Sequence, residues 1–192
     1  FHPRVKAHAK ECLGLPGDRP VALFGAAQNT DVRKGLHCIR DAVREIPALR
    51  SLHWCGFGDA PLSLDVEHST HFGLVSNDRF MAVLYSAADV FVIPSLEEAF
   101  GLTALEAAAC GTPVAGFDAG GIPDIVRPGM NGELVPTGDS RALGEAILSL
   151  SNDTELRENW IRRSPRWLYH NFSYHRNAEA YAALYESMIC HD

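Results

Sequence analysis

Pro94-Ser-Leu-Glu-Glu-Ala-Phe-Gly-Leu-Thr-Ala-Leu-Glu106 is the segment from which the fold of this chain is most readily inferred. The apolar run at 88–94 predicts a buried strand, and the Ala- and Leu-rich run at 102–109 predicts a helix. A strand, a short turn with glycine and a helix form half of a nucleotide-binding unit, because the free N–H groups at the start of the helix can bind a phosphate. Gly101 lets that phosphate approach the backbone without a Cβ in the way.

Two glutamates of this segment, Glu98 and Glu106, suggest different roles. Glu98 precedes the helix, where it could contact whatever is attached to the diphosphate. Glu106 lies inside the helix among small and apolar neighbours, where a carboxylate is costly to bury without a partner. The vicinal diol of a ribose offers two hydroxyl donors to such a carboxylate. The alternative is that Glu98 is an ordinary first-turn residue and that Glu106 faces solvent.

Composition and charge narrow the class of protein. With 46% hydrophobic and 21% charged residues, the chain reads as a soluble globular protein, and its 192 residues suffice for one well-buried domain. A formal charge of −7 argues against a general nucleic-acid binder. No apolar run reaches transmembrane length, the first residues do not resemble a signal peptide, and the chain lacks an initiator Met. We therefore expect a piece of a longer, cytoplasmic protein.

Several common chemistries have no support in the sequence. The five cysteines form no Cys-x-x-Cys pair, so we predict reduced thiols rather than a zinc site or a disulfide framework. The histidines show no metal-ligand spacing. The chain lacks Gly-x-Ser-x-Gly, His-Glu-x-x-His and Gly-x-x-x-x-Gly-Lys-Ser/Thr, and the loop after its first strand lacks Gly-x-Gly-x-x-Gly.

Apolar strands and amphipathic helices alternate along the chain. This alternation implies an α/β fold with a doubly wound parallel sheet, Rossmann-like, whose ligands bind at the carboxyl ends of the strands. We expect residues 1–20 to be a linker with a short helix, 21–170 the Rossmann-like domain, and 171–192 a C-terminal helix. The strands are predicted at 21–25, 52–55, from 70, at 88–94, 113–117 and 131–135, and the helices at 35–45, from 78, at 102–109 and 139–150.

The motifs together resemble those of family 4 retaining glycosyltransferases. The resemblance covers the chain from about residue 21 to its end, and several motifs in the family's order are far more specific than any one alone. It implies the C-terminal, donor-binding half of a GT-B fold, with an N-terminal acceptor domain outside this chain. The motifs are Arg33-Lys34-Gly35, Tyr85-Ser-Ala-Ala-Asp89, Pro-Ser-x-x-Glu-x-Phe-Gly-x-x-x-x-Glu-Ala from Pro94, Cys110-Gly-Thr-Pro-Val114, Gly120-Gly-Ile-Pro-Asp124 and Asn131-Gly-Glu-Leu-Val135.

This resemblance implies a role for each candidate site residue. Glu98 would hold the donor sugar and Glu106 the ribose, and the backbone near Val75 would meet the nucleobase. Lys34 would be the cation of the diphosphate, and Glu98 and Lys34 are the expected catalytic residues. The backbone that would contact the diphosphate belongs to Phe100, Gly101 and Leu102.

The loop after the first strand departs from the family pattern. The family commonly has an Arg after the strand glycine and a Lys five or six residues later. Here Ala26 stands in the Arg position, and Lys34 follows eight residues after it. Either Arg33 supplies the missing cation, or diphosphate binding relies more on Lys34 and the helix N-terminus.

We therefore interpret the sequence as the donor domain of an enzyme that transfers a hexose from an NDP-sugar to a hydroxyl acceptor, in polysaccharide or glycolipid synthesis. The sugar or lipid-linked acceptor would bind the N-terminal domain, and the whole enzyme would lie in the cytoplasm, at the inner face of the membrane. No metal or other cofactor is implied, because no Asp-x-Asp element accompanies the phosphate contacts. The isolated chain should be inactive.

Two alternatives stay open. One is a sucrose- or trehalose-type synthase of the same fold. The other is a non-catalytic nucleotide-binding domain of GT-B type, which Ala26 favours and the glutamate pair disfavours.

The C-terminal segment predicts a helix with an apolar stripe at helical spacing. Core packing is the expected use of this stripe. In the resembling family the last helix crosses back towards the other domain, so part of the stripe should lack its partner here. The stripe consists of Ala178, Tyr181, Leu184, Tyr185 and Met188.

Overall fold

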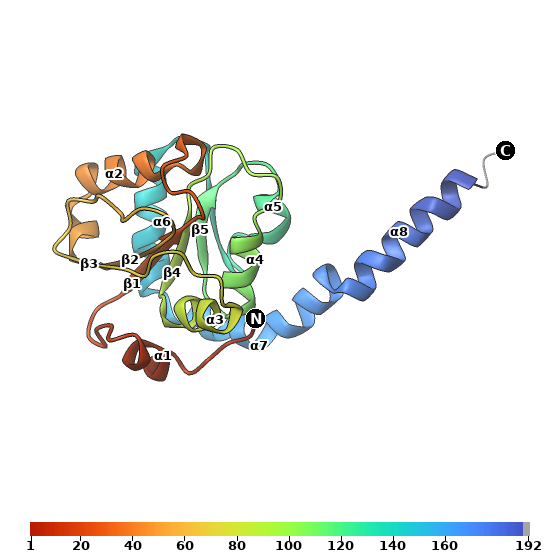
Figure 1. Cartoon of the computed structure of the whole chain (residues 1–192), viewed down its shortest axis with the longest axis horizontal. Helices are drawn as coiled ribbons and strands as arrows, with labels where there is room; N and C mark the ends of the chain where they lie inside the picture. Colours follow the sequence, from red (N-terminus) through yellow and green to blue (C-terminus); the bar gives the residue numbers. More distant parts are fainter. Residues whose placement is uncertain (190–192) are drawn as a thin grey trace.

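The computed structural model of the chain describes residues 1–189 and contains one sheet of six parallel strands (Figure 1). The strand order β3-β2-β1-β4-β5-β6 reverses between β1 and β4, which is the crevice where doubly wound sheets bind their ligands. The predicted Rossmann-like parallel sheet is confirmed. Its strands are β1 (Val21–Gly25), β2 (His53–Phe57), β3 (His68–His71), β4 (Val90–Ile93), β5 (Val114–Phe117) and β6 (Gly132–Val135).

Helices cover both faces of this sheet (Figure 1). On one face α2 packs against α6, and on the other α3 packs against α1 and α4. Two short 3₁₀ segments, η1 (Val32–Lys34) and η2 (Pro47–Ser51), flank α2. The helices are α1 (Lys6–Cys12), α2 (Leu36–Glu45), α3 (Asp78–Ala87), α4 (Leu102–Ala109), α5 (Ile122–Ile125), α6 (Ser140–Asn152), α7 (Thr154–Phe172) and α8 (Tyr174–Ile189).

The central strands are buried at every position, because helices cover both of their faces. β1, β4 and β5 read as continuous apolar runs without polar alternation, which is typical of parallel sheets. Trp160 of α7 is fully buried and donates its indole N–H to the Ala108 carbonyl at 2.8 Å. This contact anchors α7 to the end of α4.

A buried cluster of charged side chains links α1 and α7 to the amino ends of β1 and β4. The Asp89 carboxylate accepts the Val21 N–H at 2.8 Å and pairs with Lys6 and Lys10. Arg157 of α7 donates to the carbonyl of Ala88, just beyond the end of α3. The segment before β1 is thereby held against the body. The predicted limits of the domains stay predictions.

The last helix, α8, projects away from the body (Figure 1) and contains no buried residue. Tyr181, Leu184, Tyr185 and Met188 are each more than half exposed. Core packing, which we expected for this stripe, is therefore wrong within the described residues. The physical reason is that within residues 1–189 α8 contacts mainly α7, so no other described element covers its apolar face.

Four cysteines lie within the described residues, and all four are free thiols. Cys12 is exposed, whereas Cys38, Cys55 and Cys110 are buried. Burial raises the pKa of the Cys55 thiol to about 12 and that of Cys110 to about 11, which makes both poor nucleophiles. Cys190 lies outside the described residues.

Candidate functional site

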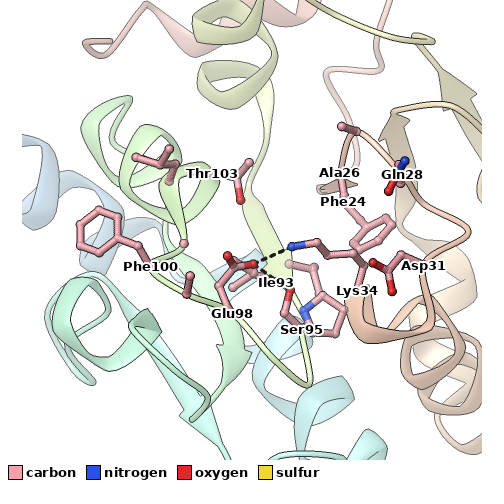
Figure 2. Close-up of a pocket in the computed structure, with 17 residues that line it drawn as sticks. Phe24, Ala26, Gln28, Asp31, Lys34, Ile93, Ser95, Glu98, Phe100 and Thr103 are labelled. Carbon is pink, nitrogen blue, oxygen red and sulfur yellow. Dashed lines mark hydrogen bonds and ion pairs between the residues drawn. The ribbon is translucent and has the colours of Figure 1, made fainter.

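A pocket of about 450 Å³ lies at the carboxyl ends of β1 and β4, where the strand order reverses (Figure 2). The loop after β1 and the loop between β4 and α4 form its walls. The structure brings five of the eight predicted donor-binding residues together here. They are Lys34, Glu98, Phe100, Gly101 and Leu102.

Four further polar residues line the same pocket and were not assigned from the sequence. Three of them lie in the two loops that the motifs had already marked and Thr103 lies in the first turn of α4, so nearness to those motifs was the available signal. A single sequence gives no spacing rule that would separate them from their neighbours. They are Gln28, Asp31, Ser95 and Thr103.

The loop after β1 has its shape fixed by a buried amide. The Asn29 side chain is 2% exposed, accepts the Ala26 N–H at 2.9 Å and donates to the Phe57 carbonyl at 2.9 Å. Asp31 then accepts the Arg33 N–H and begins η1. This ordered turn carries Lys34 to the pocket although it follows Ala26 by more residues than the family pattern has.

Backbone contacts lock the two loops together. Gly35 has φ +72°, and a Cβ at this position would overlap the Pro94 carbonyl. Next to this contact the Leu96 N–H donates to the Arg33 carbonyl at 2.8 Å. The side chain of Lys34 therefore lies beside the second loop.

Lys34 and Glu98 form an ion pair across the pocket (Figure 2). Lys34 Nζ lies 2.8 Å from Glu98 Oε2, and the Ser95 hydroxyl donates to the same oxygen at 3.3 Å. The two side chains are only 31% and 17% exposed. Two residues that the resemblance assigns to different parts of a donor thus bind each other in this structure.

The helix N-terminus at Gly101 completes the pocket. Gly101 has φ +94° in the left-handed region, and no side chain of residues 1–189 caps α4. The first N–H groups of the helix are therefore available to an anion, and the helix dipole favours negative charge there. Leu102 is 63% exposed beside them, and the Phe100 ring points away from Lys34 (Figure 2).

The Gly120-Gly121 turn supports the backbone of Glu98 from below. Gly120 has φ +53°, and a Cβ there would overlap the Glu98 carbonyl. The Gly121 N–H donates to that carbonyl at 3.3 Å. The close approach to the loop between β4 and α4, which carries Glu98, explains together with turn geometry why glycine occupies position 120.

Glu106 lies outside the pocket and is half-buried between α3 and α4. Its Oε2 accepts the hydroxyl of Tyr85, which is fully buried, at 2.9 Å. Burial raises the pKa of the Glu106 carboxyl, and the Tyr85 hydrogen bond opposes that shift. The alternative in which Glu106 simply faces solvent does not describe this environment.

The remaining two predicted residues also lie outside the pocket. Val75 lies in the loop before α3 and is half-buried. Arg33 is exposed and does not line the pocket, and its guanidinium pairs with Asp31 at 2.8 Å. The structure thus brings Lys34, and not Arg33, to the helix N-terminus.

In residues 1–189, no three His, Cys, Asp or Glu side chains gather as metal ligands would. In the same residues no helix combines the length and apolarity of a membrane span. Donor binding without a metal stays a prediction.

The sequence profile of the family described as "Glycosyl transferases group 1" matches residues 13–167. The chain belongs to this family. The matched region contains every strand of the sheet and both loops of the pocket. The resemblance to family 4 glycosyltransferases that the motifs indicated is thereby confirmed.

Individual relatives of this group 1 chain agree with the family. The D-inositol 3-phosphate glycosyltransferase of Saccharomonospora viridis is 32% identical over 98% of this chain and 48% of its own length. Sucrose-phosphate synthase of Thermosynechococcus elongatus superposes with a TM-score of 0.81 at 30% identity, over 100% of this chain and 50% of that one. HepE of Anabaena, solved with UDP-glucose, gives 0.77 at 22% identity over 96% and 54%, a likeness of fold alone. The chain spans about half the length of these proteins.

Proposed function

We propose that this group 1 chain is the donor-binding half of a retaining glycosyltransferase that transfers a hexose from an NDP-sugar to a hydroxyl acceptor. The observation that carries the proposal is the juxtaposition of Lys34 and Glu98 with the uncapped N-terminus of α4, at the strand reversal. A cation and a helix dipole at one point suit the diphosphate leaving group, whose negative charge grows as the glycosidic bond breaks. Glu98, beside them, suits the hydroxyls of the hexose.

Glu106 has the chemistry to hold the ribose. Its carboxylate takes one hydrogen bond from Tyr85 and has further acceptor capacity for a diol. The fold neighbour HepE, which was solved with UDP-glucose, supports an NDP-hexose as the donor class.

The acceptor is proposed from the names of relatives. The relative from Saccharomonospora viridis is named for D-inositol 3-phosphate, which supports a hydroxyl acceptor. A synthase of the sucrose-phosphate type is the second candidate, favoured by the TM-score of 0.81 over the whole chain. Use in polysaccharide or glycolipid synthesis, a cytoplasmic position at the inner face of the membrane and independence of metal belong to the proposal for the whole enzyme.

Calorimetric titration of the chain with UDP, GDP and ADP tests the donor site. One nucleotide should bind, and Glu106→Ala should lose that binding. Glu158→Ala is the matched control, because Glu158 is exposed on α7 and far from the pocket along the chain. Binding that survives in Glu106→Ala contradicts the ribose role, and no binding by the natural chain favours the non-catalytic alternative.

Lys34→Ala tests the diphosphate contact. Loss of a charge-assisted hydrogen bond should weaken nucleotide binding by about 1.5–3 kcal/mol, which is roughly 10- to 100-fold. Arg33→Ala should change affinity much less, because Arg33 does not line the pocket and its guanidinium is already paired with Asp31. Equal losses in the two variants would restore Arg33 as the second cation.

A further inference from the structure

Two of the charged side chains of the pocket, Lys34 and Glu98, already pair with one another. Lys34 Nζ contacts Glu98 Oε2 at 2.8 Å, and Ser95 donates to the same oxygen. A phosphate that binds Lys34 therefore competes with Glu98 for the same ammonium group. The side chains are 31% and 17% exposed, so solvent compensates only part of what each loses.

We propose that this ion pair makes the site prefer an NDP-sugar over the NDP that the transfer leaves behind. The inference rests on the proposed function and concerns how the same site distinguishes the NDP-sugar donor from the NDP product. Glu98 is then a determinant of selectivity between donor and product as well as a contact for the sugar.

The preference follows from what each ligand offers to Glu98. An NDP takes Lys34 with its phosphate and leaves the Glu98 carboxylate without its cation, beside a new negative charge. An NDP-sugar also takes Lys34, but its hexose hydroxyls can donate to the carboxylate in place of the ammonium. Its terminal phosphate also carries less negative charge, because the sugar ester occupies one oxygen, so it repels the Glu98 carboxylate less. At Glu98, both effects favour the donor.

The backbone around the pair allows it to re-form by side-chain rotation alone. Gly35, next to Lys34, lies against the Pro94 carbonyl, and the Gly121 N–H donates to the Glu98 carbonyl. Neither loop needs to move for Nζ to reach Oε2. Once the sugar has left, Glu98 therefore competes with the product for Lys34 and helps to expel it.

Paired titrations test this selectivity. The chain and its variants are titrated with UDP and UDP-glucose, GDP and GDP-mannose, and ADP and ADP-glucose. In Glu98→Gln, the matching NDP should bind about fivefold tighter, the equivalent of an ion pair worth about 1 kcal/mol, because Lys34 is released. The ratio of NDP-sugar affinity to NDP affinity should fall in the same variant.

Glu97→Gln is the matched control. It removes the same charge one residue away, but Glu97 is exposed and does not pair with Lys34. It should leave both affinities and their ratio unchanged. Tighter NDP binding in both variants would reduce the effect to general charge and overturn the inference.

The remaining outcomes separate the inference from the proposed function. Unchanged or weaker NDP binding in folded Glu98→Gln overturns the inference, while loss of binding in Lys34→Ala would still support the donor site. If neither the natural chain nor any variant binds any of the six ligands, both are overturned. Circular dichroism of each variant establishes that it is folded.

Discussion

At the scale of single residues, Glu106 carries an electrostatic cost that its surroundings offset only in part. Its carboxyl is half-buried, and the Tyr85 hydroxyl is its one hydrogen-bond partner among the described side chains. Burial raises the pKa of Glu106 above its ordinary value of 4.5. Between the ordinary pKa and the raised pKa, the folded chain binds more protons than the unfolded chain. Glu106 therefore makes the free energy of unfolding fall as the pH rises through that interval.

Glu106→Gln should remove this dependence. Gln still accepts the Tyr85 hydroxyl but carries no charge, so the variant should melt at or above the natural chain at pH 7. Its melting temperature should also change less on going from pH 7 to 4.5. Thermal melts followed by circular dichroism over that range measure both, with exposed Glu158→Gln as control. A variant less stable than the natural chain at pH 7 would contradict the argument.

The position of Glu106 on its helix could be read from the sequence, whereas its partner could not. Tyr85 lies 21 residues earlier on α3, and only the packing of α3 on α4 brings the hydroxyl to the carboxylate. The Lys34 and Glu98 contact spans 64 residues for the same reason. The motifs indicated five of the residues that line the pocket, and tertiary packing determined which side chains touch.

At the scale of elements, the Gly120-Gly121 turn packs against the backbone of Glu98, in the loop between β4 and α4. Gly120→Ala should destabilise the chain by about 1–3 kcal/mol, because it places an L-residue at positive φ and a Cβ against the Glu98 carbonyl. Gly129→Ala is the matched control, since Gly129 has φ +71° with open space around its Cβ position. Urea unfolding should show the larger loss for Gly120→Ala, together with weaker nucleotide binding. Equal losses would mean that backbone strain alone matters.

Strands and helices around the site were predictable because their signals are local. β4 is an unbroken apolar run and α4 is rich in Ala and Leu, with Gly101 between them. β3 begins at His68 rather than at the predicted residue 70, and its residues alternate between half-buried and exposed. Parallel edge strands give weaker patterns than central ones.

At the scale of the whole molecule, α8 contributes little to the stability of the body. It has no buried residue, so deletion of residues 174–192 should leave the melting temperature of the rest nearly unchanged. Deletion from residue 154 also removes Trp160, which is fully buried, and should cost several kcal/mol, typically about 3–5 kcal/mol for a buried aromatic alone. Differential scanning calorimetry distinguishes the two. A large loss on the shorter deletion would contradict the exposed placement of α8.

Helical periodicity could not reveal that exposure. The spacing of Tyr181, Leu184 and Met188 is the same whether a helix faces its own core or another surface. The two cases differ in whether another part of the protein packs against the apolar stripe, and a local spacing pattern carries no information about that.

The main-chain lock between the two pocket loops also has a consequence for engineering. Because Gly35 and Gly120 meet carbonyl groups and the Leu96 N–H meets the Arg33 carbonyl, the frame depends little on the side chains that line the cavity. A library that randomises Gln28 and Thr103 should therefore keep most of its members folded while it varies the wall around the ligand. Changes of donor preference are to be sought at those two positions, with the glycines left intact.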